Sequence, residues 1–173
     1  VIEDNRIVTR AAYFEDLIAA KGRLNLKLAK GDATSLQALS TEEKGRVIQY
    51  FEKIKFAGTN INIISIQPDE IVLTDMTVYH DGVKTDAEIR AAVETAMDNY
   101  LVNLPFNGVF YIEAFRDAIQ SVDNIVDVYI VELNRNQYSG QGNVTQEIVR
   151  KATLDAGYAV IDDASLLKIQ IEA

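Results

Sequence analysis

The chain has 173 residues, of which 48% are hydrophobic and 25% charged, a composition typical of globular proteins and not of disordered or fibrous ones. Seventeen Lys and Arg against 26 Asp and Glu give a net charge of -9, which disfavours binding to nucleic acid or to anionic membranes. Without cysteine the chain has no disulfide, thiolate nucleophile or cysteine metal site, and no segment approaches the ~20 apolar residues of a membrane span. The absence of cysteine is compatible with the cytoplasm but does not exclude export, so the sequence does not identify the cellular compartment.

Helices are expected in the first 58 residues. From Asn5 to Ala29 the apolar residues recur at spacings of three and four, which predicts an amphipathic helix. After a loop at Gly31–Ser40, Thr41 is the expected cap of a second helix, with acidic residues in its first turn, and Gly58 ends it. Because the chain begins at Val1 and shows no signal region, we expect a fragment excised from a longer protein.

The pattern changes from helical to alternating after Gly58. A strand is expected at Ile61–Ile66, a turn at Pro68-Asp69, and a longer strand at Ile71–His80. On the longer strand we expect one buried face and one wet face. The buried face is predicted to hold Val72, Met76 and Val78, and the wet face Asp75, Thr77 and Tyr79.

A helix, a strand, a short helix and a strand are predicted next. Thr85 and Glu88 have the spacing of a capping box, which predicts a helix from there to about Leu104. Val109–Ile112 predicts a short strand, and a helix follows from about Glu113. Ile125–Leu133 is apolar on both faces apart from Asp127, so we expect a central strand that is at least partly covered on both sides.

The last 37 residues are expected to add a loop, a helix and a hairpin. Gln137–Asn143 has the composition of a flexible loop, Val144–Ala156 is interpreted as a helix, and Tyr158–Ile161 with Leu166–Ile171 as a closing β-hairpin. The predicted fold is therefore α+β, a small mixed sheet with helices packed on it. An N-terminal helical segment (1–58), a core domain (59–136) and a C-terminal region (137–173) are expected.

Few residues have the chemistry of a site. His80, the only histidine, could act as a base with Asp75 or Asp81, but before Asp81-Gly82 an exposed turn residue is the favoured interpretation. Asp162-Asp163 could hold a cation, although adjacent carboxylates in a turn are usually solvated. Gly140-x-Gly142 lacks the lysine and the third glycine of a phosphate-binding loop. We predict no catalytic, cofactor-binding or metal-binding residue.

The aromatic residues are expected to serve mainly in packing. Eight of them are predicted to be buried: Tyr50, Phe51, Phe56, Tyr100, Phe106, Phe110, Tyr111 and Phe115. Tyr79, Tyr129 and Tyr138 are expected to be exposed, and exposed tyrosines on strands favour a protein interface.

Five segments between Asp75 and Val128 follow one another in an order typical of a known family. They are Asp75-Met76-Thr77-Val78-Tyr79, a helix ending Asn99-Tyr100-Leu101-Val102-Asn103-Leu104, Gly108-Val109-Phe110-Tyr111-Ile112, a helix from Phe115 to Val122, and Ile125-Val126-Asp127-Val128. This stretch resembles the C-terminal region of phage baseplate J-like proteins, and Ala156–Asp162 resembles their terminal sheet element more loosely. Where the family often has glycine before the last strand, this chain has Asn124, which tolerates positive φ. The first 56 residues resemble nothing that we can name.

The resemblance implies a structural and non-enzymatic role in a contractile-tail baseplate of a phage or a phage-derived machine. It implies assembly in the bacterial cytoplasm, other baseplate or tail proteins as partners, homo- or hetero-oligomers, and no cofactor. Two alternatives stay open. One is a ligand-binding or regulatory module whose site is the wet face around Asp75, Thr77 and Tyr79, and the other is a metalloenzyme that uses Asp162 or Asp163 with other carboxylates.

Overall fold

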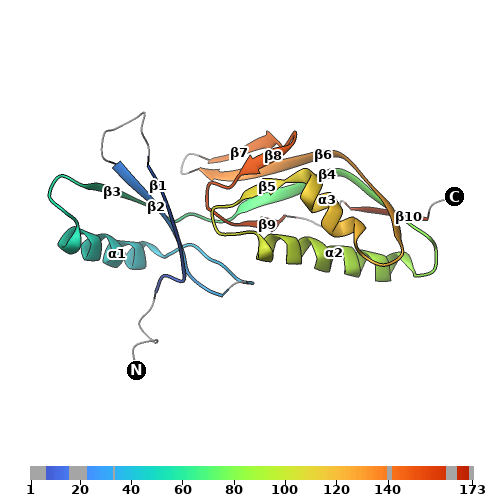
Figure 1. Cartoon of the computed structure of the whole chain (residues 1–173), viewed down its shortest axis with the longest axis horizontal. Helices are drawn as coiled ribbons and strands as arrows, with labels where there is room; N and C mark the ends of the chain where they lie inside the picture. The colour runs from blue at the N-terminus through green and yellow to red at the C-terminus, as the bar shows by residue number, and fades with distance from the viewer. Residues whose placement is uncertain (1–6, 16–22, 33, 140–141, 163–166, 172–173) are drawn as a thin grey trace, which may run out of the picture. The chain divides into compact units, whose positions relative to one another are not determined.

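The chain forms an α+β fold that divides into two compact units, Val1–Pro68 (the N-terminal unit) and Asp69–Ala173 (the C-terminal unit) (Figure 1). The computed structural model describes residues 7–15, 23–32, 34–139, 142–162 and 167–171. In this part of the chain no helix is long and apolar enough to cross a membrane.

The described residues of the N-terminal unit form a three-stranded sheet and one helix. Strand β1 (Arg10–Glu15) pairs antiparallel with β2 (Arg23–Ala29), and β2 pairs parallel with β3 (Asn60–Ile64). Helix α1 (Thr41–Ile54) lies between β2 and β3 in the chain, as parallel pairing requires a crossover. The small core of this unit contains Leu28, Leu39 and Ile63, with apolar side chains of α1 packed against them.

The predicted helix from Asn5 to Ala29 is wrong where the structure describes that segment. The described residues form β1 and β2 instead, so Arg23 and Lys27 lie on a strand. Leu24, Leu26 and Leu28 alternate with polar residues, which is the strand period. All three pair with β1, and Leu24 and Leu26 also pair with β3. Tertiary pairing has outweighed the helical propensity of Leu, Ala and Lys.

Helix α1 begins one residue earlier than expected. Its cap is Ser40 and not Thr41: the Ser40 hydroxyl accepts from the Glu43 N–H (3.2 Å), and Glu43 Oε2 accepts from the Ser40 N–H (2.7 Å). Lys30 Nζ lies 2.8 Å from the same carboxylate oxygen and ties the loop before α1 to its first turn. The bonds from Lys30 and Ser40 lower the pKa of Glu43.

The C-terminal unit is built on a five-stranded sheet. Its two long strands, β4 (Asp69–His80) and β6 (Ile125–Ser139), pair antiparallel, and β7 (Gly142–Glu147) extends the sheet beyond β6. On the other side of β4, β9 (Ala159–Ile161) pairs with its first half and β10 (Lys168–Ile171) with its second. A separate pair joins β5 (Val109–Tyr111) to β8 (Lys151–Thr153).

The expected closing hairpin is wrong, because β9 and β10 each pair parallel with β4 and not with one another. The expected helix at Val144–Ala156 is also wrong, since β7 and β8 occupy that segment. The predicted loop at Gln137–Asn143 is largely strand: β6 continues through Ser139 and forms a hairpin with β7. Residues 140 and 141 lie outside the described part of the chain.

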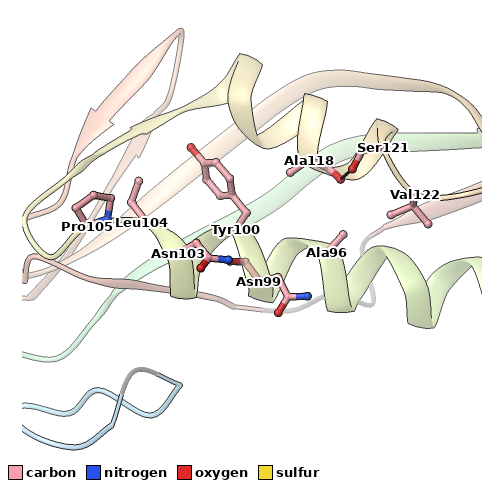
Figure 2. A pocket seen from close by; sticks show the side chains of 9 residues that line it. All are labelled: Ala96, Asn99, Tyr100, Asn103, Leu104, Pro105, Ala118, Ser121 and Val122. Carbon is pink, nitrogen blue, oxygen red and sulfur yellow. Dashed lines mark hydrogen bonds between the residues drawn. The ribbon is translucent and has the colours of Figure 1, made fainter.

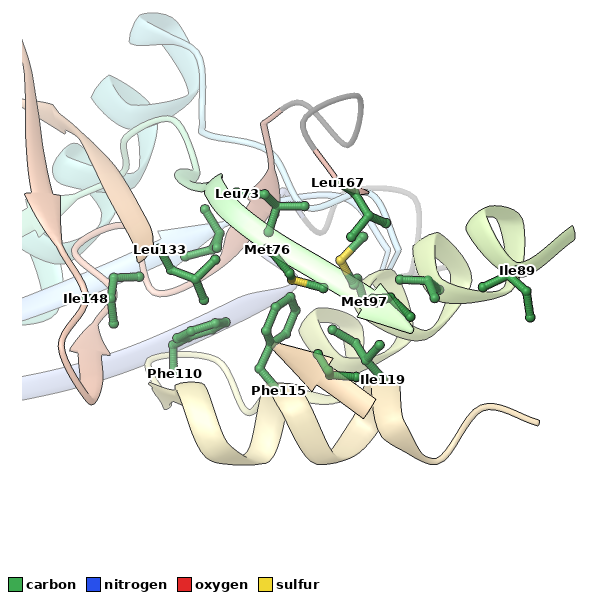
Figure 3. Packing of buried hydrophobic residues seen from close by; sticks show 14 of the residues in the cluster. Leu73, Met76, Ile89, Met97, Phe110, Phe115, Ile119, Leu133, Ile148 and Leu167 are labelled. Carbon is green, nitrogen blue, oxygen red and sulfur yellow. The ribbon is translucent and has the colours of Figure 1, made fainter. Parts of the chain in front are cut away.

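Helices α2 (Asp86–Asn103) and α3 (Ile112–Gln120) cover one face of this sheet (Figures 1 and 3). The capping box predicted for Thr85 and Glu88 is confirmed, with both reciprocal bonds present. A single apolar core lies between the helices and the sheet. Its fully buried members include Ile71, Leu73, Met76, Val78, Ile89, Val93, Phe110, Phe115 and Ile119.

A β-bulge corrects the predicted faces of β4. Met76 and Val78 face the core as expected, but the register shifts between Leu73 and Asp75, which moves Val72 to the opposite face. Ile71 and Leu73 take the core positions before the bulge. An extra residue in one strand reverses the alternation that a sequence pattern assumes.

Strand β6 is an inner strand, as predicted, but it is covered on one face only. Val128 and Leu133 are buried against the helices, whereas Tyr129 is 57% exposed and Val126 and Val131 are exposed too. Before the strand, Asn124 has φ 72°, the left-handed conformation expected of a residue that replaces glycine there.

Candidate functional site

His80 is buried, and this corrects its interpretation as an exposed turn residue. Its ring has no exposed surface, and Nε2 lies 3.0 Å from Asp86 Oδ1 in the first turn of α2. The Gly82 N–H donates to Nδ1 (3.3 Å), so Nε2 carries the proton and donates it to Asp86. The ring joins the end of β4 to the start of α2 and offers no nitrogen to a substrate.

Neither carboxylate proposed as a partner of His80 pairs with it. Asp75 forms an ion pair with Lys168 of β10 (2.7 Å). Asp81 accepts from the Val83 N–H and from the Asn124 side chain, both at 3.0 Å, and the bond from Asn124 is the main cause of its lowered pKa. Through these two bonds Asp81 stabilises the turn between β4 and α2.

The predicted wet face of β4 is only partly accessible. Thr77 is buried, Tyr79 and Asp75 are half-buried, and the Asp75 carboxylate is paired with Lys168. The three cavities described below are lined by other residues. None of these three cavities lies at the face of β4 that the ligand-binding alternative proposes as its site.

A second polar group that sequence reasoning missed is buried where β4, β6 and β8 meet. The Arg135 guanidinium lies 3.7 Å from Asp69 Oδ1 and donates to the Thr153 carbonyl and to Gln146 Oε1 (2.7 Å). Asp69 Oδ2 accepts from the Ala156 N–H (2.9 Å). Burial, with the Asp69 charge as a second cause, raises the pKa of Tyr158 from 10.0 to about 12.

The buried Arg135–Asp69 group holds neighbouring strands together. The guanidinium is held by groups from neighbouring strands, and the residues around it line a polar cavity of about 270 Å³ that also includes Glu147, Lys151 and Asp155. The cavity mixes two basic and two acidic side chains, a balance that selects neither cations nor anions. The sequence gives little sign of this buried group, because Arg135 lies among other polar residues at the end of β6.

Of the two carboxylates proposed as a cation site, the structure describes only Asp162. Asp162 is exposed and its N–H donates to the Ile71 carbonyl (3.0 Å), while Asp163 lies outside the described residues. Gly142 opens β7, and Gly140 also lies outside them. Among the described residues no three His, Asp or Glu side chains form a group able to hold a metal ion.

A groove of about 460 Å³ runs between α2 and α3 (Figure 2). Small side chains, Ala96 from α2 and Ala118 from α3, leave the space, and Tyr100 and Val122 add apolar walls. Asn99 and Asn103, one turn apart on α2, form its polar rim. This surface, the α2–α3 groove, is apolar inside and polar at the edge, as docking surfaces for protein segments are.

The N-terminal unit has an apolar groove of its own, about 580 Å³, between α1 and the start of β1. Tyr50 and Phe51 of α1 line it with Val8 and Ala11. The expected burial of the aromatic residues is wrong here: Tyr50 is 60% exposed and Phe56 86%. Phe110 and Phe115 are buried as predicted, whereas Tyr111 is exposed.

Tyr129 is exposed as predicted, Tyr79 is half-buried, and the side chain of Tyr138 lies outside the described residues. Exposed large apolar side chains thus occur on α1 and on β6, and half-buried ones line the α2–α3 groove. The comparisons with models of protein families and with curated proteins give no match.

Proposed function

We propose that this chain is a structural component of a contractile-tail baseplate, of a phage or of a phage-derived machine, and that it acts by protein–protein assembly without catalysis. The observation that carries the proposal is the order β4-α2-β5-α3-β6, in which the five segments that resemble baseplate J-like proteins pack around one core. The resemblance supplies the biological setting.

The distribution of apolar surface supports an assembly role. Tyr129 and Val131 on β6, and Tyr50 and Ile54 on α1, are large apolar side chains that are more than one-third exposed. Aromatic side chains of this kind dominate the energetics of protein interfaces because they bury a large rigid area. Among the buried polar side chains of the C-terminal unit, His80 and Arg135 bond to other parts of the fold.

The test is to locate the protein in assembled tails. Particles from a host that produces the chain and a contractile tail are labelled with gold-conjugated antibody against the chain and viewed by electron microscopy. We expect the label at the baseplate end of the tail. Intact tails that carry no label, with the protein wholly in the soluble fraction, would show that the proposal is wrong.

A further inference from the structure

The two units carry very different charges. Residues 1–68 contain ten Lys and Arg and eight Asp and Glu, a net charge of +2, whereas residues 69–173 contain seven and eighteen, a net charge of -11. One copy of the chain therefore offers a weakly basic surface and a strongly acidic one. Opposite charges on two parts of the same molecule favour contact between the unlike parts of two copies.

The α2–α3 groove belongs to the acidic unit, and among the described residues no basic side chain lines it. Exposed Asp98, Asp117 and Asp123 each neighbour a groove-lining residue in the chain. The basic residues of these two helices are engaged elsewhere: Arg90 donates to the Leu167 carbonyl (2.7 Å), and Arg116 pairs with Glu113. An occupant of this groove is therefore expected to be apolar with a basic flank.

Helix α1 presents a surface of that kind. Arg46, Tyr50 and Ile54 are spaced by four residues, so they form one row along the helix, and all three are exposed. Lys53 adds a second exposed cation beside Ile54, which is 55% exposed. We call Arg46, Tyr50 and Ile54 the α1 stripe.

The geometry of the two surfaces is compatible. Residues four apart on a helix are about 6 Å apart along its axis, and the groove wall on α2 has the same period at Ala96, Tyr100 and Leu104. Rows of this period interlock in the commonest class of helix packing. Arg46 is bonded to Glu42 (2.6 Å), but an exposed pair within one helix contributes little and can be exchanged.

We propose that the α1 stripe of one copy docks in the α2–α3 groove of a second copy, so that copies associate head to tail. This inference rests on the proposed assembly function and names a partner surface for it. Each chain carries both halves of such a contact, and a contact between unlike surfaces repeats into a ring or an open filament. Tyr50 and Ile54 enter the groove, and Arg46 and Lys53 bring positive charge to the acidic unit.

Sedimentation velocity of the full chain tests the proposal at concentrations up to about 1 mM, which detects even weak contacts. We expect species larger than a monomer that grow with concentration. They should weaken as NaCl rises from about 0.15 M to about 1 M, where the screening length falls to about 3 Å. A chain that stays monomeric throughout this range overturns the proposal.

Two variants each remove one half of the contact. Ile54→Glu places a carboxylate in the α1 stripe, and it is chosen because Ile54 does not line the groove of its own unit. Asn99→Trp fills the α2–α3 groove from an exposed position. Each should weaken association about tenfold or more, as interface-centre substitutions do. Val149→Glu is the control: Val149 is 81% exposed and lies outside both surfaces, so association should stay unchanged.

Mixing the two variants gives the decisive result. The Ile54→Glu chain keeps an intact groove and the Asn99→Trp chain an intact stripe, so an equimolar mixture should form heterodimers that cannot extend further. A contact between identical surfaces cannot produce this outcome. Unchanged self-association of either folded variant, or a mixture that remains monomeric, overturns the proposal. Circular dichroism checks that the variants are folded, and Ala118→Trp and Lys53→Glu replace any that is not.

The outcomes separate this inference from the proposed function. Self-association that obeys the variant pattern, in a protein absent from tail particles, would sustain the docking contact and reject the baseplate role. Gold label at the baseplate for both the wild type and Ile54→Glu, with the self-association of Ile54→Glu unchanged, would sustain the baseplate role and reject the docking contact.

Discussion

His80 shows at the scale of a single residue how one buried polar side chain holds two elements together. Replacing it with alanine leaves a cavity and removes the acceptor of the Gly82 N–H. We expect His80→Ala to lower the free energy of unfolding by about 2 to 4 kcal/mol, measured by urea denaturation.

Asp86→Asn is the matched control for His80. Its amide oxygen can still accept from Nε2, and the Asp86 side chain is largely exposed, so we expect a cost below about 1 kcal/mol from the lost charge at the start of α2. An equal cost for both variants would mean that the charge of Asp86 stabilises the fold and that the buried ring does not.

Tyr158 predicts a loss of stability in alkaline solution. Its pKa is raised from 10.0 to about 12, so the folded state holds the phenol proton more tightly than the unfolded state does. The resulting stabilisation is complete below pH 10 and disappears as the pH rises towards 12. Urea denaturation across that window should show a steeper decline for the wild type than for Tyr158→Phe. Parallel curves would contradict the assignment.

At the scale of an element, the start of α2 provides a comparison between identical substitutions. Thr85→Ala removes the acceptor of the Glu88 N–H and half of the capping box, and should cost about 1 kcal/mol. Thr95→Ala lies in the middle of the same helix, where the exposed Thr95 only donates to the Ala91 carbonyl. There we expect no loss or a gain of a few tenths of a kcal/mol, since alanine is the better helix former. Thermal melts of both variants measure the difference.

Elements with local signals could be predicted, and elements made by distant pairing could not. Helix α2 has its cap and apolar stripe in one continuous segment, so its sequence is sufficient. Strand β2 contains helix-forming leucine, alanine and lysine, and it becomes a strand because β1 and β3 pair with it. Strands β9 and β10 each align with part of β4, about 90 residues earlier in the chain, and no turn signal specifies that register.

The same limit applies to the candidate docking surfaces. The predicted exposure of Tyr129 is confirmed and concerns one side chain on one strand. The α2–α3 groove exists because Ala96 and Ala118 lie opposite each other, and only packed helices bring two such alanines together. Tyr50 and Ile54 fit a helical apolar stripe, yet the small sheet of the N-terminal unit covers only part of α1. A sequence pattern gives the stripe and not the area available to bury it.

At the scale of the whole molecule, the two units have separate cores of unequal size. Among the described residues, the N-terminal core has three buried members, Leu28, Leu39 and Ile63, and α1 has no buried residue. In the described part of the C-terminal unit the core has fifteen buried members, including Phe110 and Phe115. Because stability grows with buried apolar area, the N-terminal unit should be the weaker one.

We therefore expect unfolding in two steps, with the N-terminal unit first. Leu28→Ala should lower only the first transition and Phe115→Ala only the second, by about 2 to 5 kcal/mol each, since each leaves a cavity in one core. Calorimetry gives the two transitions, and amide hydrogen exchange assigns them to β2 or to β4. Below the concentration at which copies associate, the first transition should not depend on protein concentration. A single transition that both substitutions lower together would mean that the two cores fold as one cooperative unit.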